Sequence, residues 1–147
     1  MAAIAPVAQE PTPVEIANWQ AGRSNARQAY QSQLATSNYQ RQQAGLANQI
    51  YNRQAQFGNQ QERQNFDDPY IGRGIFNSGI RQQGLLNMYT NQANQAATAQ
   101  QQYLAQLGGY GVQDQNALAG QNTSLANIDA QELARRTQLA SEIKGII

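Results

Sequence analysis

The sequence predicts an all-α protein of extended, polar helices, about three in number, which assemble into an oligomeric helical bundle. Three observations lead to this prediction. The 147 residues include 27 Gln, 14 Asn and 23 Ala, and Gln and Ala favour helices. Leu, Ile, Val and Phe together supply only 26 residues, which is below roughly one fifth of the chain. The large apolar residues recur at helical spacing, so each helix has a thin apolar stripe that needs a partner.

The composition argues against an enzyme. The chain contains neither Cys nor His, which removes thiolate ligands and the commonest general base and metal ligand. Asp67 and Asp68 are adjacent, but the spacing of a calcium-binding loop does not follow them. The run Gly72-Arg73-Gly74 lacks the Lys-Ser/Thr of a phosphate-binding loop. We therefore expect no catalytic residues, cofactor, metal or small-molecule substrate.

Residues 1–13 are expected to form an extended, Pro-rich arm, because Pro6, Pro11 and Pro13 oppose a helix there. The arm is either disordered or lies along a neighbouring subunit. It lacks the charge and apolar pattern of a signal peptide, and the chain has no apolar run that could form a transmembrane segment.

A long polar helix is predicted over residues 14–64. Thr12 is its expected N-cap, with Pro13 in the first turn and Glu15 three residues after the cap, as in a capping box. Its large apolar residues are sparse. A set spaced by 7, 4 and 7 residues is predicted to share one face: Tyr39, Leu46, Ile50 and Phe57.

Residues 65–80 are predicted to form a structured, Gly-rich turn that reverses the chain, because Gly, Pro, Asp and aromatic residues concentrate there. The turn is either a small local core or a surface that docks on a different protein. The candidate docking residues are Phe66, Tyr70, Ile71, Arg73, Ile75, Phe76 and Ile80.

Residues 81–147 are predicted to form a helical hairpin, with Asn77-Ser78 as a possible cap and a break at Gly108–Gly111. A stripe at heptad spacing is the candidate seam for self-association, and a polar Gln at its centre would fix the register. This stripe consists of Leu85, Tyr89, Gln92, Ala96 and Tyr103, with Ala99 beside them. The alternative is that the stripe packs within one chain against the helix at 113–144.

The arginines of the first helix are expected to form a solvated face that also allows weak contact with genomic DNA. Residues 20–65 contain five arginines and one acid, Glu62. A net charge of +1 is too small for strong binding to free DNA.

One short motif resembles a known class of protein. The segment Pro69–Gly84, with its order Arg-Gly, two apolar residues, then Asn-Ser-Gly at 77–79, is similar to turns between long Gln/Ala-rich helices in small virion proteins of tailed bacteriophages. The stretch from Ile128 to Gly145 has the same character, and the polar helices also resemble internal core and ejection proteins of podoviruses. The resemblance implies a structural role in the virion and no catalytic or ligand residues.

We therefore expect a structural component of a tailed-phage virion that is assembled in the host cytoplasm. It would oligomerise through its helices and dock on portal, tail or capsid proteins. Two alternatives remain open at this point. One is an internal core or ejection protein that is released with the genome. The other is a non-viral, Gln-rich helical adaptor.

Overall fold

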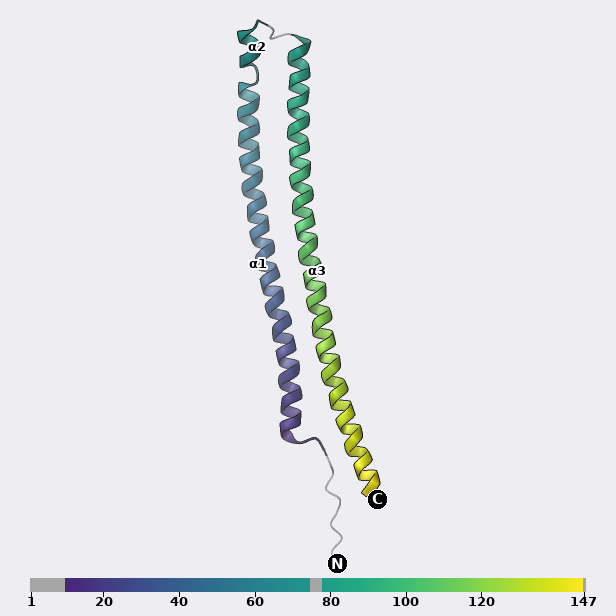
Figure 1. Ribbon diagram of the computed structural model, residues 1–147. Helices are drawn as coiled ribbons and strands as arrows, with labels where there is room; N and C mark the ends of the chain where they lie inside the picture. The colour runs from purple at the N-terminus through teal and green to yellow at the C-terminus, as the bar shows by residue number, and fades with distance from the viewer. Residues whose placement is uncertain (1–9, 75–77, 147) are drawn as a thin grey trace, which may run out of the picture. The chain divides into compact units, whose positions relative to one another are not determined.

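The computed structural model describes residues 10–74 and 78–146, and these are almost entirely helical, with no strand among them. Helix α1 spans Pro13–Asn65, the short helix α2 spans Asp68–Gly72, and helix α3 spans Gly79–Ile146 (Figure 1). The all-α prediction is confirmed. Most of the predicted N-terminal arm, together with Ile75 and Phe76 of the predicted docking residues, lies outside the described residues.

Both long helices begin where the sequence placed their caps. The backbone N–H of Glu15 donates to Thr12 Oγ1 at 3.2 Å, which satisfies one of the unpaired donors of the first turn of α1. The N–H of Arg81 donates to Ser78 Oγ, also at 3.2 Å. The Glu15 carboxylate interacts with Arg135 of α3, so it links the two helices.

The predicted break at Gly108–Gly111 is wrong, because α3 continues through these glycines to Ile146. Residues 81–147 therefore do not form a hairpin. Each Gly costs a helix roughly 1 kcal/mol relative to Ala, but half-buried positions continue through the segment at helical spacing, at Leu107, Tyr110 and Asp114. Packing along the whole helix thus overrides the local preference of Gly for a helix end.

The described chain divides into two compact units. The first contains the α1 segment up to Ser37 and the α3 segment from Val112 onward. Within it, the two segments pack along each other in opposite directions, with Gly22 facing Ile128. A Cβ added at Gly22 would lie 3.0 Å from Ile128 Cδ1, so this Gly allows the close approach. The half-buried apolar residues of the unit include Ile16, Trp19, Tyr30, Leu34, Leu125, Ile128 and Ile143.

The second unit contains residues 38–111, and so includes the end of α1, all of α2 and the start of α3. Its two long segments are also antiparallel, with Gly45 beside the Tyr103 hydroxyl and Arg63 beside Gln92. Positive φ among the described residues occurs at Gly74 (φ 67°), in the connection that follows α2. A residue other than Gly would be strained there.

The core of both units is thin. Ala44, Met88 and Leu139 are its buried hydrophobic residues, and no described side chain is less than 2% exposed. The accessible surface is 10998 Å², whereas a folded monomer of 16.1 kDa exposes about 7,400 Å² by the usual size scaling. The chain therefore leaves much more surface uncovered than a compact monomer of its mass.

The predicted apolar face of α1 does not pack on α3. Tyr39, Leu46, Ile50 and Phe57 are all between 53% and 62% exposed. The residues that do face α3 are the smaller Ser37, Ala44, Asn48 and Ala55. These four large apolar residues share one face of α1, as predicted, but this face is turned away from α3.

Candidate partner-docking site

The turn between the two long helices forms a groove. Asp67 precedes α2 and Pro69 lies in its first turn, where a missing N–H costs nothing. The rings of Phe66 and Tyr70 contact each other in a tilted arrangement, with their centroids 5.1 Å apart and their planes at 39°. The groove has a volume of about 490 Å³, and we call it the turn groove. It is lined by Glu62, Asn65, Phe66, Pro69, Tyr70, Arg73 and Ile80.

Two contacts hold α2 against α3. Arg81 Nε lies 2.7 Å from Asp67 Oδ1, and this hydrogen bond raises the pKa of Arg81. Gly84 of α3 lies under the aromatic pair, where an added Cβ would overlap the Tyr70 hydroxyl and lie 3.3 Å from Phe66 Cζ. The glycine therefore allows the aromatic pair to rest directly on the α3 backbone.

The turn groove brings together four of the predicted docking residues, Phe66, Tyr70, Arg73 and Ile80. Phe66 and Tyr70 are half-buried, whereas Ile80 is 68% exposed. Ile71 is 58% exposed and is not among the lining residues. The site thus combines a half-buried aromatic pair with exposed aliphatic side chains beside it.

The predicted seam of α3 is divided between two environments. Gln92 is 5% exposed, and Leu85 and Tyr103 are half-buried, while Tyr89 and Ala96 are exposed. The buried members face α1 of the same chain. The alternative prediction, a hairpin of this stripe with residues 113–144, is wrong, because both belong to the continuous helix α3.

The buried amide of Gln92 bonds to α1 through both its oxygen and its nitrogen. Its Oε1 accepts from Arg63 Nε at 3.1 Å and from Arg63 Nη2 at 3.0 Å, and its Nε2 donates to Glu62 Oε2 at 3.1 Å. The Arg63 guanidinium also lies 4.8 Å from the centroid of the Tyr89 ring, within range of a cation–π interaction. Only one alignment of α1 and α3 satisfies this amide, so Gln92 fixes their register.

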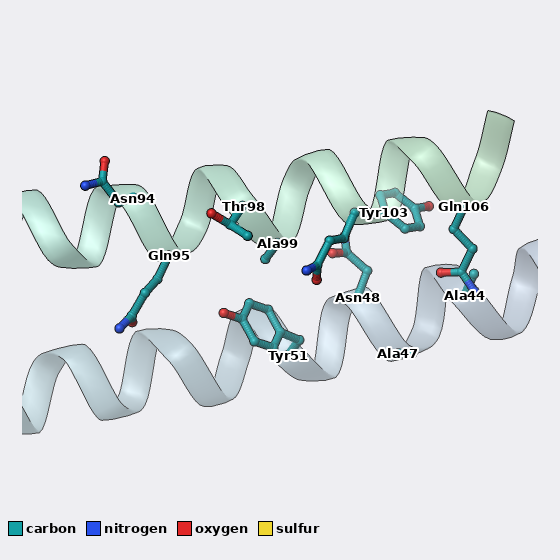
Figure 2. Close-up of a pocket in the computed structure, with 11 residues that line it drawn as sticks. Ala44, Ala47, Asn48, Tyr51, Asn94, Gln95, Thr98, Ala99, Tyr103 and Gln106 are labelled. Atoms are coloured by element: carbon teal, nitrogen blue, oxygen red, sulfur yellow. The ribbon is translucent and has the colours of Figure 1, made fainter. Parts of the chain in front are cut away.

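A second groove of the same unit lies beside this seam and is lined mainly by amides and alanines. Figure 2 shows the Tyr51 ring directed from α1 toward α3, with Asn48 and Gln95 nearby. Its volume is about 480 Å³. The lining residues offer hydrogen bonds but no carboxylate, ammonium or guanidinium group. They are Ala44, Ala47, Asn48, Tyr51, Asn94, Gln95, Thr98, Ala99, Gln102, Tyr103 and Gln106.

In the first unit, ion pairs form both within α3 and between α1 and α3. Arg136 pairs with Glu132 at 3.1 Å, as the i,i+4 spacing predicts. Arg23 of α1 also binds Glu132, and it binds Asp129 at 2.8 Å. Hydrogen bonds from Arg23 and then Arg136 lower the pKa of Glu132. Bonds to Asp129 and Glu132 raise the pKa of Arg23.

Several arginines of α1 have hydrogen-bond partners within the chain. Arg23 and Arg63 face α3, and Arg41 bonds to Asn38 at 3.1 Å. Arg27 and Arg53 remain exposed. The arginines therefore do not form one uninterrupted stripe of the kind that follows a phosphate backbone.

Comparisons with known proteins found no family model, curated protein or solved structure that matches this chain significantly. Within residues 10–74 and 78–146, no helix is long and apolar enough to cross a membrane. The same residues hold no cluster of acidic side chains suited to a metal ion. Among the described residues, the turn groove is the candidate site.

Proposed function

We propose that the chain is a structural component of a tailed-phage particle, assembled in several copies and docked on a neighbouring portal, tail or capsid protein. The observation that carries the assembly role is the thin core combined with 10998 Å² of accessible surface. A chain with so few buried side chains gains stability when its exposed apolar residues are covered by partners. The particle context comes from the resemblance of residues 69–84 to turns of phage virion proteins.

The turn groove is the proposed contact with the neighbouring protein. Its aromatic pair is held in place by Gly84 and by the Arg81–Asp67 pair, so little conformational freedom is lost on binding. Ile80 and Ile71 supply exposed apolar area at its edge. Arg73 and Glu62 provide charged groups for the polar rim that such interfaces have.

The docking role is tested by Ile80→Gln in particles that carry the variant. Ile80 is 68% exposed, so the substitution leaves the helix pair folded and removes apolar area from the groove. We expect severalfold lower incorporation into purified particles, measured by mass spectrometry. Leu133→Gln is the matched control, because Leu133 is 67% exposed and lies far along α3. Equal incorporation of both variants would contradict the docking role.

An averaged density map of the particle tests the structural assignment itself. A fixed structural protein gives ordered, symmetric copies, and these remain after the genome has left. An internal core or ejection protein is lost from the emptied particle. Absence of the chain from purified particles would rule out the particle context and leave the helical adaptor as the better interpretation.

A further inference from the structure

We propose that two copies of the chain associate by packing the exposed apolar stripe of α1 against a matching stripe on α3 of the other copy. This inference rests on the proposed function, since it names the surfaces through which the oligomer forms. We call the two surfaces the α1 stripe and the α3 stripe. The α1 stripe consists of Tyr39, Leu46, Ile50 and Phe57, and the α3 stripe consists of Leu86, Ala93, Ala97 and Leu104.

The α1 stripe lies opposite the intramolecular seam. Each member follows a seam residue by two positions: Leu46 follows Ala44, and Ile50 follows Asn48. Two residues correspond to about 200° of rotation in an α-helix. Because the seam already holds α1 against α3, the α1 stripe is left without a partner in the second unit. Four large apolar side chains at exposures of 53% to 62% are unusual for a chain that stays alone.

The α3 stripe repeats the spacing of the α1 stripe in the same unit. Its members are also separated by 7, 4 and 7 residues, and Leu86 and Leu104 are 67% and 55% exposed. The two central positions are Ala93 and Ala97, whereas the central positions of the α1 stripe are Leu46 and Ile50. Large side chains of one helix can therefore enter the space above small ones of the other, as in close helix packing.

Charge disfavours a parallel pair of α1 stripes and is compatible with pairing between unlike stripes. Residues 82–113 of α3 contain no Asp, Glu, Lys or Arg, so the exposed Arg53 beside the α1 stripe meets no like charge there. Two α1 stripes packed in parallel would instead bring Arg53 of each copy together.

Cysteine trapping in the full-length chain tests the pairing. The natural sequence has no Cys, so every disulfide reports an introduced residue. Ile50→Cys and Ala97→Cys are made in separate chains, one of which carries a tag that shifts its mass. The two positions lie at the same level of the helix pair, given that Gly45 lies beside Tyr103. After mixing and mild oxidation, we expect the mixed dimer well above the share that random pairing gives.

A second measurement uses variants that keep the helix pair intact. Ile50→Gln is expected to weaken association at least tenfold in sedimentation equilibrium, with unchanged helix content at high concentration. Val112→Gln is the control, because Val112 is 56% exposed against 54% for Ile50 and belongs to neither stripe. We expect Val112→Gln to change the association constant by less than twofold.

The outcomes separate this inference from the proposed function. Disulfide-linked dimers formed only between two chains that both carry Ile50→Cys, or association that is insensitive to Ile50→Gln, overturn the pairing of unlike stripes but leave an oligomeric structural protein in place. A chain that remains a monomer at every concentration, with a sharp unfolding transition independent of concentration, overturns both.

Discussion

The guanidinium of Arg63 donates two hydrogen bonds to a single oxygen of Gln92, from Nε at 3.1 Å and from Nη2 at 3.0 Å. The amide nitrogen of Gln92 donates to Glu62 on the same helix as Arg63. The buried amide of Gln92 on α3 thus hydrogen-bonds to two adjacent charged residues of α1, Glu62 and Arg63. This arrangement fixes the alignment of two helices whose apolar contacts alone would permit a shift by one turn.

Gln92→Glu should destabilise the second unit near neutral pH. The new carboxylate still accepts from Arg63, but it replaces the donor to Glu62 with a like charge at hydrogen-bond distance. We expect a loss of about 1–2 kcal/mol, as for a buried hydrogen bond that is broken. Urea unfolding followed by circular dichroism at fixed protein concentration measures this loss.

The control for Gln92→Glu is Gln100→Glu, which adds the same charge at an exposed position of the same helix. Acidification should restore part of the stability of Gln92→Glu, because a protonated carboxyl can again donate to Glu62. An equal effect of the two substitutions would show that the Gln92 contacts contribute nothing specific.

Gly84→Ala should destabilise the turn even though Gly84 lies inside a helix. Elsewhere in a helix the change is favourable by roughly 1 kcal/mol, but here the added methyl overlaps the Tyr70 hydroxyl. Gly120→Ala is the control, since a Cβ at Gly120 has no neighbour within 4 Å. In thermal unfolding, we expect Gly120→Ala to have a higher melting temperature than the natural chain and Gly84→Ala to have a lower one.

Tyr70→Phe should rescue Gly84→Ala, because it removes the atom that the new methyl overlaps. The double variant should then recover most of the lost melting temperature. If Gly84→Ala alone is as stable as Gly120→Ala, the contact between α2 and α3 is not the one described.

Local signals in the sequence predicted where the two long helices begin. Contacts between residues far apart in the chain could not be predicted. Thr12 and Ser78 cap α1 and α3 as expected, because capping depends on residues within one turn. The glycines within 108–111 led to a wrong prediction, because whether a helix continues there depends on packing along the whole of α3 and not only on local residues. The pairing of Arg23 with Glu132 leaves no short-range pattern in the sequence.

The candidate sites were predictable to different degrees. Gln92 stood out because it interrupts an apolar stripe, and its polar contacts lie on α1 of the same chain. The sequence could not show that its partner is α1, because α1 carries two faces and the larger apolar residues lie on the outer one. The large apolar side chains of α1 thus mark its exposed stripe, whereas small residues such as Ala44 form its contact with α3.

Ser37→Ala should stabilise the chain. Ser37 is 2% exposed, and its Oγ has no hydrogen-bond partner among the described residues. Removing the hydroxyl relieves a buried unsatisfied group and improves helix propensity, so we expect a gain of about 1–2 kcal/mol. Ser24→Ala, at an exposed position of the same helix, supplies the propensity term alone. Similar gains for both variants would mean that the buried hydroxyl carries no penalty.

The first unit should lose stability in acid through Glu132. Hydrogen bonds from Arg23, then Arg136, lower its pKa below the ordinary value of 4.5. A carboxyl with a lowered pKa in the folded state contributes stability that is fully present above the unfolded-state value of 4.5 and is lost as the pH falls through the lowered pKa. Arg23 stays charged throughout this range, so the loss comes from the carboxyl.

Glu132→Gln should therefore flatten the pH dependence of the first unit below about pH 4.5. Trp19 is the single Trp of the chain and is half-buried in α1 of that unit, so its fluorescence follows urea unfolding there selectively. Glu142→Gln is the control, because the Glu142 carboxylate accepts from the amide of Gln138 rather than from an Arg. At neutral pH Glu132→Gln should have a lower urea midpoint than the natural chain, and the two midpoints should converge in acid. Parallel curves for the natural chain and Glu132→Gln across this range would show that the Arg23–Glu132 pair does not stabilise the folded unit.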